Sequence, residues 1–169
     1  VFADADLAAA AEAIAVAGYF NAGQDCTAAT RVIVQDSVYD QFVALITEQA
    51  KQIAIGAPAD EDVFLGPVNN VNQLARITDL LSRVPAHAQV MTGGSALERP
   101  GFFFPATVVA GLHQSDELIQ KEIFGPVITV QKFTDEAQAV AMANGVEYGL
   151  ASSVWTTNHG TAMRMAKAF

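Results

Sequence analysis

Short β-rich segments alternate with longer segments of helical periodicity along most of the chain, and this alternation restricts the fold more than any other feature. Strands are predicted at residues 31–35, 89–92, 107–110, 127–130 and 152–155. Helices are predicted at residues 7–18, 38–53, 71–84, 137–143 and 158–169, where apolar residues recur at helical spacing. Such alternation is typical of a mostly parallel sheet covered on both faces. We therefore expect a three-layer α/β/α fold, with its ligand-binding loops at the carboxyl ends of the strands.

Three local patterns refine the predicted helices. Asp4 and Asp6 are placed where a carboxylate favours the start of the first helix. Ser37 and Asp40 have the arrangement of a capping box at the start of the second helix. We expect one apolar stripe of the last helix to pack into the core, and it consists of Ala162, Met165, Ala166 and Phe169.

Composition excludes several classes of partner. Eighteen acidic residues against nine basic ones give a formal net charge of −9. An acidic surface without a Lys/Arg cluster repels phosphate backbones, so no nucleic-acid partner is expected. No apolar run approaches the roughly 20 residues that a transmembrane helix needs. No leader peptide is recognisable, so secretion is not supported, and no membrane partner is expected.

The 169 residues suit a single domain with a proper hydrophobic core. The chain begins within an apparent strand and ends within an apparent helix. We therefore expect residues 1–169 to be one domain of a longer protein.

Cys26 is the only cysteine of the chain. One thiol closes no internal disulfide and builds no thiolate-rich metal site, which leaves a buried spectator or a reactive nucleophile. Gly23 permits a tight turn or a close approach of the backbone. The residues around the sulfur are small or polar, where a core position would carry Leu or Val. These neighbours favour the nucleophile.

A second segment strengthens this interpretation. Lys121–Val127, with the sequence KEIFGPV, together with the Asn-x-Gly-Gln-x-Cys pattern that ends at Cys26, resembles the aldehyde dehydrogenase superfamily. The segments 1–7, 64–68 and 148–155 match the same family in order and at fitting distances, so the resemblance covers essentially the whole chain. Within the superfamily, the segment Gly23–Ala29 and the acidic balance look most like gamma-aminobutyraldehyde dehydrogenases.

The resemblance implies a mechanism and a set of site residues. The Cys26 thiolate would attack an aldehyde carbonyl to form a thiohemiacetal, hydride transfer to NAD or NADP would leave a thioester, and water would release the carboxylic acid. The backbone N–H of Cys26 would donate to the oxyanion. Glu122 would accept hydrogen bonds from the hydroxyls of the nicotinamide ribose, and Phe124 would pack beside it. Outside the motif, Glu122 would be an ordinary surface charge and Phe124 a core aromatic.

The resemblance also implies an oligomeric state, a cofactor preference and the place of this domain in a larger protein. It indicates a cytoplasmic homo-oligomer, a tetramer or a dimer, and favours NAD over NADP. Residues 1–169 would be the cysteine-bearing catalytic domain, without the dinucleotide-binding domain, the general base upstream of Val1 and the C-terminal segment. We therefore expect the isolated piece to show no aldehyde oxidation.

Asp25 and Thr27 flank the candidate nucleophile and are expected to line the aldehyde pocket. Asp25 could receive the ammonium group of a short aminoaldehyde such as 4-aminobutanal by a charge-assisted hydrogen bond. The alternative for Asp25 is a turn aspartate that bonds to its own backbone.

Two other functions are left open by the sequence. Acyl transfer to coenzyme A would share the thioester on Cys26 and differ only in the acceptor. A catalytically inactive fragment could act as an assembly module. No metal site is expected, because His87, His113 and His159 lack metal-ligand spacing, and isolated histidines are more often surface residues. Trp155 is expected in the core.

Overall fold

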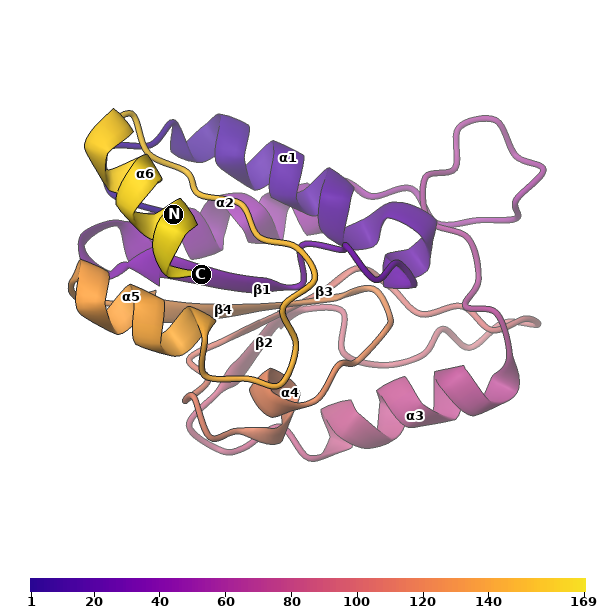
Figure 1. Ribbon diagram of the computed structural model, residues 1–169. Helices are drawn as coiled ribbons and strands as arrows, with labels where there is room; N and C mark the ends of the chain where they lie inside the picture. Colours follow the sequence, from indigo (N-terminus) through magenta and orange to yellow (C-terminus); the bar gives the residue numbers. More distant parts are fainter.

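The computed structural model describes all residues from Val1 to Phe169, and it is built around one four-stranded sheet (Figure 1). The strand order is β1-β4-β3-β2. The strands are β1 (Arg31–Gln35), β2 (Gln89–Thr92), β3 (Thr107–Ala110) and β4 (Val127–Phe133). The pairs β1–β4 and β4–β3 are parallel, and β2 joins β3 antiparallel at the edge. The predicted mostly parallel sheet is confirmed.

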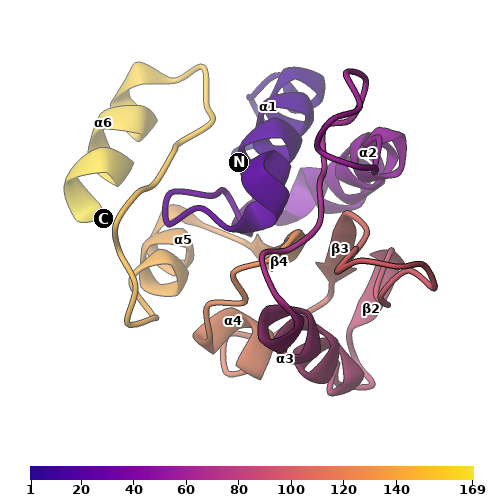
Figure 2. The ribbon, with the colours of Figure 1, turned by 90° about the vertical axis from the view of Figure 1, so that its right-hand side faces the viewer.

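Helices cover both faces of this sheet (Figure 2). One face is covered by α1 (Leu7–Tyr19) and α2 (Tyr39–Gln52). The other face carries α3 (Val71–Ser82), α4 (Glu117–Gln120) and α5 (Glu136–Ala143). The last helix, α6 (His159–Ala168), lies to one side and contacts α5. The three-layer α/β/α arrangement is therefore as predicted, with α4 as an additional short helix. No helix is long and apolar enough to cross a bilayer.

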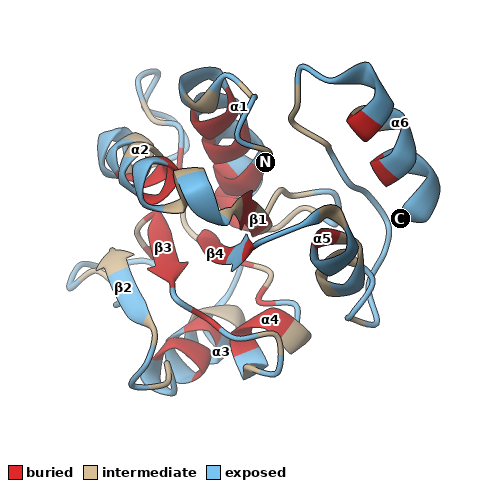
Figure 3. Ribbon diagram, turned by 90° about the vertical axis from the view of Figure 1, so that its left-hand side faces the viewer, coloured by how far each residue is buried: buried red, intermediate tan, exposed pale blue.

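The core lies between the two helical layers, where β3 and most of β4 are buried (Figure 3). All four residues of β3 are buried because helices cover both faces of this inner strand. Tyr19, at the end of α1, is fully buried, and its hydroxyl donates to the carbonyl oxygen of Thr107 at 2.9 Å. This hydrogen bond satisfies a buried polar group and joins α1 to the start of β3.

The two aspartates near the first helix have different roles. Asp6 caps α1, because its carboxylate accepts a hydrogen bond from the Ala9 N–H at 3.0 Å. Asp4 instead accepts from both Thr156 and Thr157 hydroxyls and from the Asn158 N–H, so it fastens the residues that lead into α6.

Two predicted local features are wrong. Residues 152–155 form no strand: the Phe2 N–H donates to the carbonyl oxygen of Trp155, but no ladder of further bonds follows. The predicted capping box at Ser37 does not form. A short 3₁₀ turn, η2 (Asp36–Val38), occupies this position, and α2 begins after Val38 without a side-chain cap.

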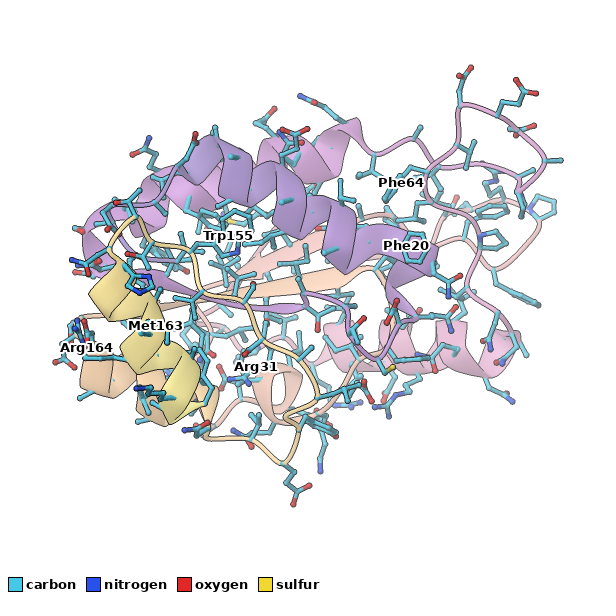
Figure 4. All side chains as sticks on the ribbon, turned by 45° about the horizontal axis from the view of Figure 1, so that its top comes forward. Phe20, Arg31, Phe64, Trp155, Met163 and Arg164 are labelled. Carbon is cyan, nitrogen blue, oxygen red and sulfur yellow. The ribbon has the colours of Figure 1, made fainter.

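The apolar stripe predicted for α6 is also not a core stripe. Only Met165 of the four residues is buried, and Phe169 is exposed. Met163 and Arg164 lie on the outer side of the helix (Figure 4), and Arg164 pairs with Glu136 of α5. The Arg164–Glu136 ion pair and the Asp4 bonds therefore add polar contacts to the limited apolar burial of α6.

Candidate active site

The two loops that carry the predicted site residues lead into neighbouring parallel strands. Cys26 lies in the connection from α1 to β1, and Glu122 lies in the connection from α4 to β4. The strands pair in parallel with Arg31 opposite Thr129, so the residues before them meet at one edge of the sheet. The predicted placement of these loops at the carboxyl ends is wrong. Both are helix-to-strand connections, and such connections reach the amino ends of the strands.

An unusual backbone shapes the loop before Cys26. Asn21, Ala22 and Gly23 follow one another in the left-handed region, with φ of 52°, 56° and 67°. Asn often adopts this conformation, whereas Ala does so at a cost, so the surrounding contacts must impose it. The Asn21 side chain donates to the Gln24 carbonyl oxygen at 3.0 Å and closes the turn. The loop is therefore held in one defined shape.

Gly23 is where the two loops meet. A Cβ at this position would lie 2.9 Å from the Pro126 nitrogen and closer still to the carbonyl group of Gly125. Only a residue without a side chain allows the two backbones to approach this closely. The sequence indicated a tight turn or a close approach at Gly23, and the structure has both. The glycine brings the Cys26 loop against the segment that carries Glu122 and Phe124.

Further hydrogen bonds from one neighbouring region fix both loops. The Gln24 side chain exchanges two bonds with Asn69: its Nε2 donates to Oδ1 at 3.2 Å, and its Oε1 accepts from the Asn69 N–H at 2.9 Å. On α3, Gln73 Nε2 donates to the carbonyl oxygens of Ile123 and Phe124 at 2.9 and 2.7 Å. Phe124 itself has a positive φ of 57°. The α3 region therefore holds the loop in a conformation that the chain disfavours by itself.

All five predicted site residues line one cavity of about 750 Å³. They are Asp25, Cys26, Thr27, Glu122 and Phe124. Cys26 is exposed, so its sulfur is open to solvent and is no buried spectator. The Glu122 carboxylate is also exposed and accepts no hydrogen bond within the chain, since Arg76 binds only its backbone carbonyl oxygen. The fold thus brings together a free thiol and a free carboxylate that are distant in sequence.

Asp25 adopts the turn conformation that was the alternative to a ligand-binding role. Its Oδ1 accepts from both the N–H and the hydroxyl of Thr27, each at 2.7 Å. These two hydrogen bonds lower the pKa of Asp25, so the carboxylate stays charged. Its second oxygen, Oδ2, accepts no hydrogen bond within the chain. The side chain can therefore hold the turn and present a negative charge to the cavity.

A model of the family described as "Aldehyde dehydrogenase family" matches residues 1–169. The chain belongs to the aldehyde dehydrogenase family. It is 40% identical to an aldehyde dehydrogenase of Emericella nidulans and 38% identical to the lactaldehyde dehydrogenase of Escherichia coli. Each match covers 99% of this chain and 34% or 35% of the relative. The chain therefore spans about a third of the length of these aldehyde dehydrogenases.

Solved structures agree with this assignment. The betaine aldehyde dehydrogenase of Staphylococcus aureus, crystallised in complex with NAD+, matches with a TM-score of 0.95 and 35% identity. The match covers 99% of this chain and 34% of that protein. The Escherichia coli lactaldehyde dehydrogenase matches with the same TM-score, 37% identity, and coverage of 99% and 35%. The finer resemblance to gamma-aminobutyraldehyde dehydrogenases stays a prediction.

The structure adds residues to the candidate site of this aldehyde dehydrogenase family member that the sequence did not single out. Gln24 and Gln73 hold the two loops, and only Gln24 gave a signal, as part of the motif before Cys26. Arg31, the first residue of β1, also lines the cavity (Figure 4). Its Nη2 donates to the Met142 carbonyl oxygen at 3.0 Å, and burial lowers the pKa of its guanidinium group. Trp155, near α1 in the same view, packs partly buried against the core and also borders the cavity.

Proposed function

We propose that residues 1–169 are the cysteine-bearing catalytic domain of a larger NAD(P)-dependent aldehyde dehydrogenase that converts an aldehyde to a carboxylic acid. The single observation that carries this proposal is the shared cavity, which combines the exposed Cys26 thiol with the unpaired Glu122 carboxylate. The chain spans about a third of its relatives, which supports a larger enzyme with further domains. By family likeness, we also propose a cytoplasmic homo-oligomer, a tetramer or a dimer.

Cys26 supplies the covalent step. Its thiolate forms a bond to the aldehyde carbonyl carbon, and the resulting oxyanion lies near the Cys26 N–H, which donates no hydrogen bond within the chain. A nicotinamide cofactor bound in the cavity would supply the acceptor for the hydride that leaves this carbon. The chain then holds a thioester on Cys26, and hydrolysis returns the thiol and releases the carboxylic acid.

Glu122 and Phe124 fit the nicotinamide end of such a cofactor. The Glu122 carboxylate has its acceptor positions free, and a carboxylate accepts two hydrogen bonds from a diol with little rearrangement. Phe124 is half-buried and borders the same cavity, so one of its ring faces can cover a ribose or a flat ring. NAD is the proposed cofactor, in line with the NAD+ complex of the Staphylococcus aureus relative.

A short aminoaldehyde such as 4-aminobutanal is the proposed substrate class. The support is Asp25, whose turn bonds use only Oδ1 and leave Oδ2 for an ammonium group. Thr27 fixes this carboxylate and lines the cavity beside it. The charge of −9 further favours a cationic substrate.

The test uses the full-length enzyme and follows NADH formation by absorbance. Cys26→Ser should abolish turnover with every aldehyde, and Glu122→Gln should raise the KM for NAD. The matched control is Glu61→Gln, because Glu61 is exposed and lies outside the cavity. Equal effects of the two Glu→Gln changes would contradict the role of Glu122. Residual NADH formation by Cys26→Ser at the wild-type rate would contradict the whole proposal.

Substrate class and acceptor are tested separately. Asp25→Asn should weaken kcat/KM for 4-aminobutanal by about tenfold or more and leave that for butanal nearly unchanged, since a charge-assisted hydrogen bond contributes about 1.5–3 kcal/mol. Equal losses for both aldehydes would contradict an ammonium contact. Product analysis by mass spectrometry should find the free acid. An acyl-coenzyme A product formed only when coenzyme A is present would replace hydrolysis by acyl transfer.

A further inference from the structure

Two histidines and one aspartate that are distant in sequence meet outside the cavity. His87 lies just before β2, His113 lies in the connection from β3 to α4, and Asp116 directly precedes α4. One ligand atom from each side chain lies within 4.8 Å of the other two. The spacing of these residues in the sequence gave no sign of the cluster. They come together only in the fold, where the pairing of β2 with β3 places His87 beside the other two.

Hydrogen bonds fix the Asp116 carboxylate beside the His87 ring and the His113 backbone. Asp116 Oδ2 lies 2.8 Å from His87 Nε2 and accepts from the His113 backbone N–H at 2.6 Å. Asp116 Oδ1 has no hydrogen-bond partner within the chain. The Asp116 side chain is only 13% exposed, whereas both histidines are exposed. The carboxylate is therefore fixed, and the two imidazoles can be reached from solvent.

We propose that His87, His113 and Asp116 form a binding site for one Zn²⁺ ion. Two imidazole nitrogens and one carboxylate oxygen are a common set of zinc ligands, and three protein ligands leave a position for water. Hard cations such as Mg²⁺ prefer oxygen ligands, so this site should select against them. The surplus of carboxylates on the chain also favours a cation over an anion.

The histidines need one adjustment to share an ion. Their rings stack with centroids 3.9 Å apart and an angle of 14° between the planes. A metal ion lies in the plane of each imidazole that binds it, so one ring must rotate before both nitrogens face the same ion. Both rings lie at the surface, where rotamers interconvert rapidly. His87 also borders a hollow of about 200 Å³ with Asp40 and Gln89, which leaves its ring room to rotate.

Binding would connect three separate parts of the chain. The ion would join His87, two residues before β2, to the β3–α4 connection and to the start of α4. Because an ion that binds only the folded state stabilises it, Zn²⁺ should raise the thermal unfolding midpoint.

The test is a calorimetric titration of the full chain with Zn²⁺. All proteins carry Cys26→Ser, since the exposed thiol is itself a zinc ligand. One ion should bind per chain. Loss of a group that only supports a metal ligand already weakens binding by about 10- to 100-fold, so His87→Gln or His113→Asn, which removes a ligand, should each weaken it by at least that much. The matched control is His159→Gln, because His159 is exposed on α6 and lies outside the cluster. Mg²⁺ should produce no comparable heat.

A second measurement separates metal binding from folding defects. Co²⁺ in place of Zn²⁺ should give visible absorption bands that both cluster variants lose, while their circular dichroism without metal matches the parent. If Zn²⁺ binds the His87→Gln/His113→Asn double variant as tightly as the parent, the proposal is wrong. Absence of any Zn²⁺ binding by the parent would equally overturn it and leave the cluster as a hydrogen-bonded His–Asp pair.

Discussion

Gly23→Ala tests whether the contact between the two loops holds the site together. Two contributions to the loss of folding stability can be estimated from the structure and then summed. An L-residue in the left-handed region, here at φ of 67°, costs about 1–2 kcal/mol. The new Cβ would also overlap the backbone of Gly125 and Pro126, which is not a flexible side chain, and overpacking costs about 1–3 kcal/mol. We expect a total loss of about 2–5 kcal/mol.

Urea unfolding followed by circular dichroism measures this loss. With a denaturant slope of about 2 kcal/mol per molar, the midpoint should fall by about 1–2.5 M. The matched control is Gly149→Ala, because a Cβ at Gly149 would meet no atom within 4 Å. Its stability should stay within about 0.5 kcal/mol of the parent. The rate of Cys26 alkylation by iodoacetamide should also change in Gly23→Ala, since this loop carries the thiol. Equal midpoints for the two variants would refute the close approach.

Three further substitutions test other contacts. Tyr19→Phe leaves the buried Thr107 carbonyl oxygen without its donor and should cost about 1–3 kcal/mol in urea unfolding; an unchanged midpoint would contradict this bond. Gln73→Leu removes both bonds to the Phe124 loop and should weaken NAD binding by the full-length enzyme, measured by fluorescence titration, whereas unchanged affinity would show that the loop holds its shape alone. Hydrogen bonds, first from Thr156, lower the pKa of Asp4 below its ordinary 3.8. The unfolded state then binds more protons, so the stabilisation from Asp4 is complete above pH 3.8 and is lost as the pH falls through the lowered value. Asp4→Asn should therefore flatten the decline of the unfolding midpoint below about pH 4, and an identical acid profile would count against the bonds to α6.

Much of the fold could be predicted because burial leaves a periodic trace in the sequence. The central strands β3 and β4 are covered on both faces and read as continuous apolar runs, and α1 and α3 carry regular apolar spacing. Residues 152–155 were also predicted as a strand, but they lack a partner ladder, because a short local pattern cannot reveal which neighbour a segment will have. The antiparallel direction of β2 likewise depends on tertiary packing.

The residues of the candidate site could be predicted from the sequence, but its position relative to the sheet could not. The motifs around Cys26 and Glu122 identified the side chains that line the cavity. The edge of the sheet was predicted wrongly, because ordinary α/β proteins bind ligands after their strands and this chain carries its loops before them. Gln73 gave no local signal, since its partners are backbone carbonyl oxygens about 50 residues away.

The parallel pairing of β1 with β4 has a consequence for changes in chain length. Because the two strands run side by side in fixed register, the number of residues between Cys26 and Arg31, and between Glu122 and Val127, sets how far the thiol and the carboxylate stand from the sheet. Inserting or deleting one residue in either linker would shift one group relative to the other and disturb the contact between the two loops at Gly23. Tolerance for insertions should instead be found in the exposed stretch at 58–62, which touches neither linker.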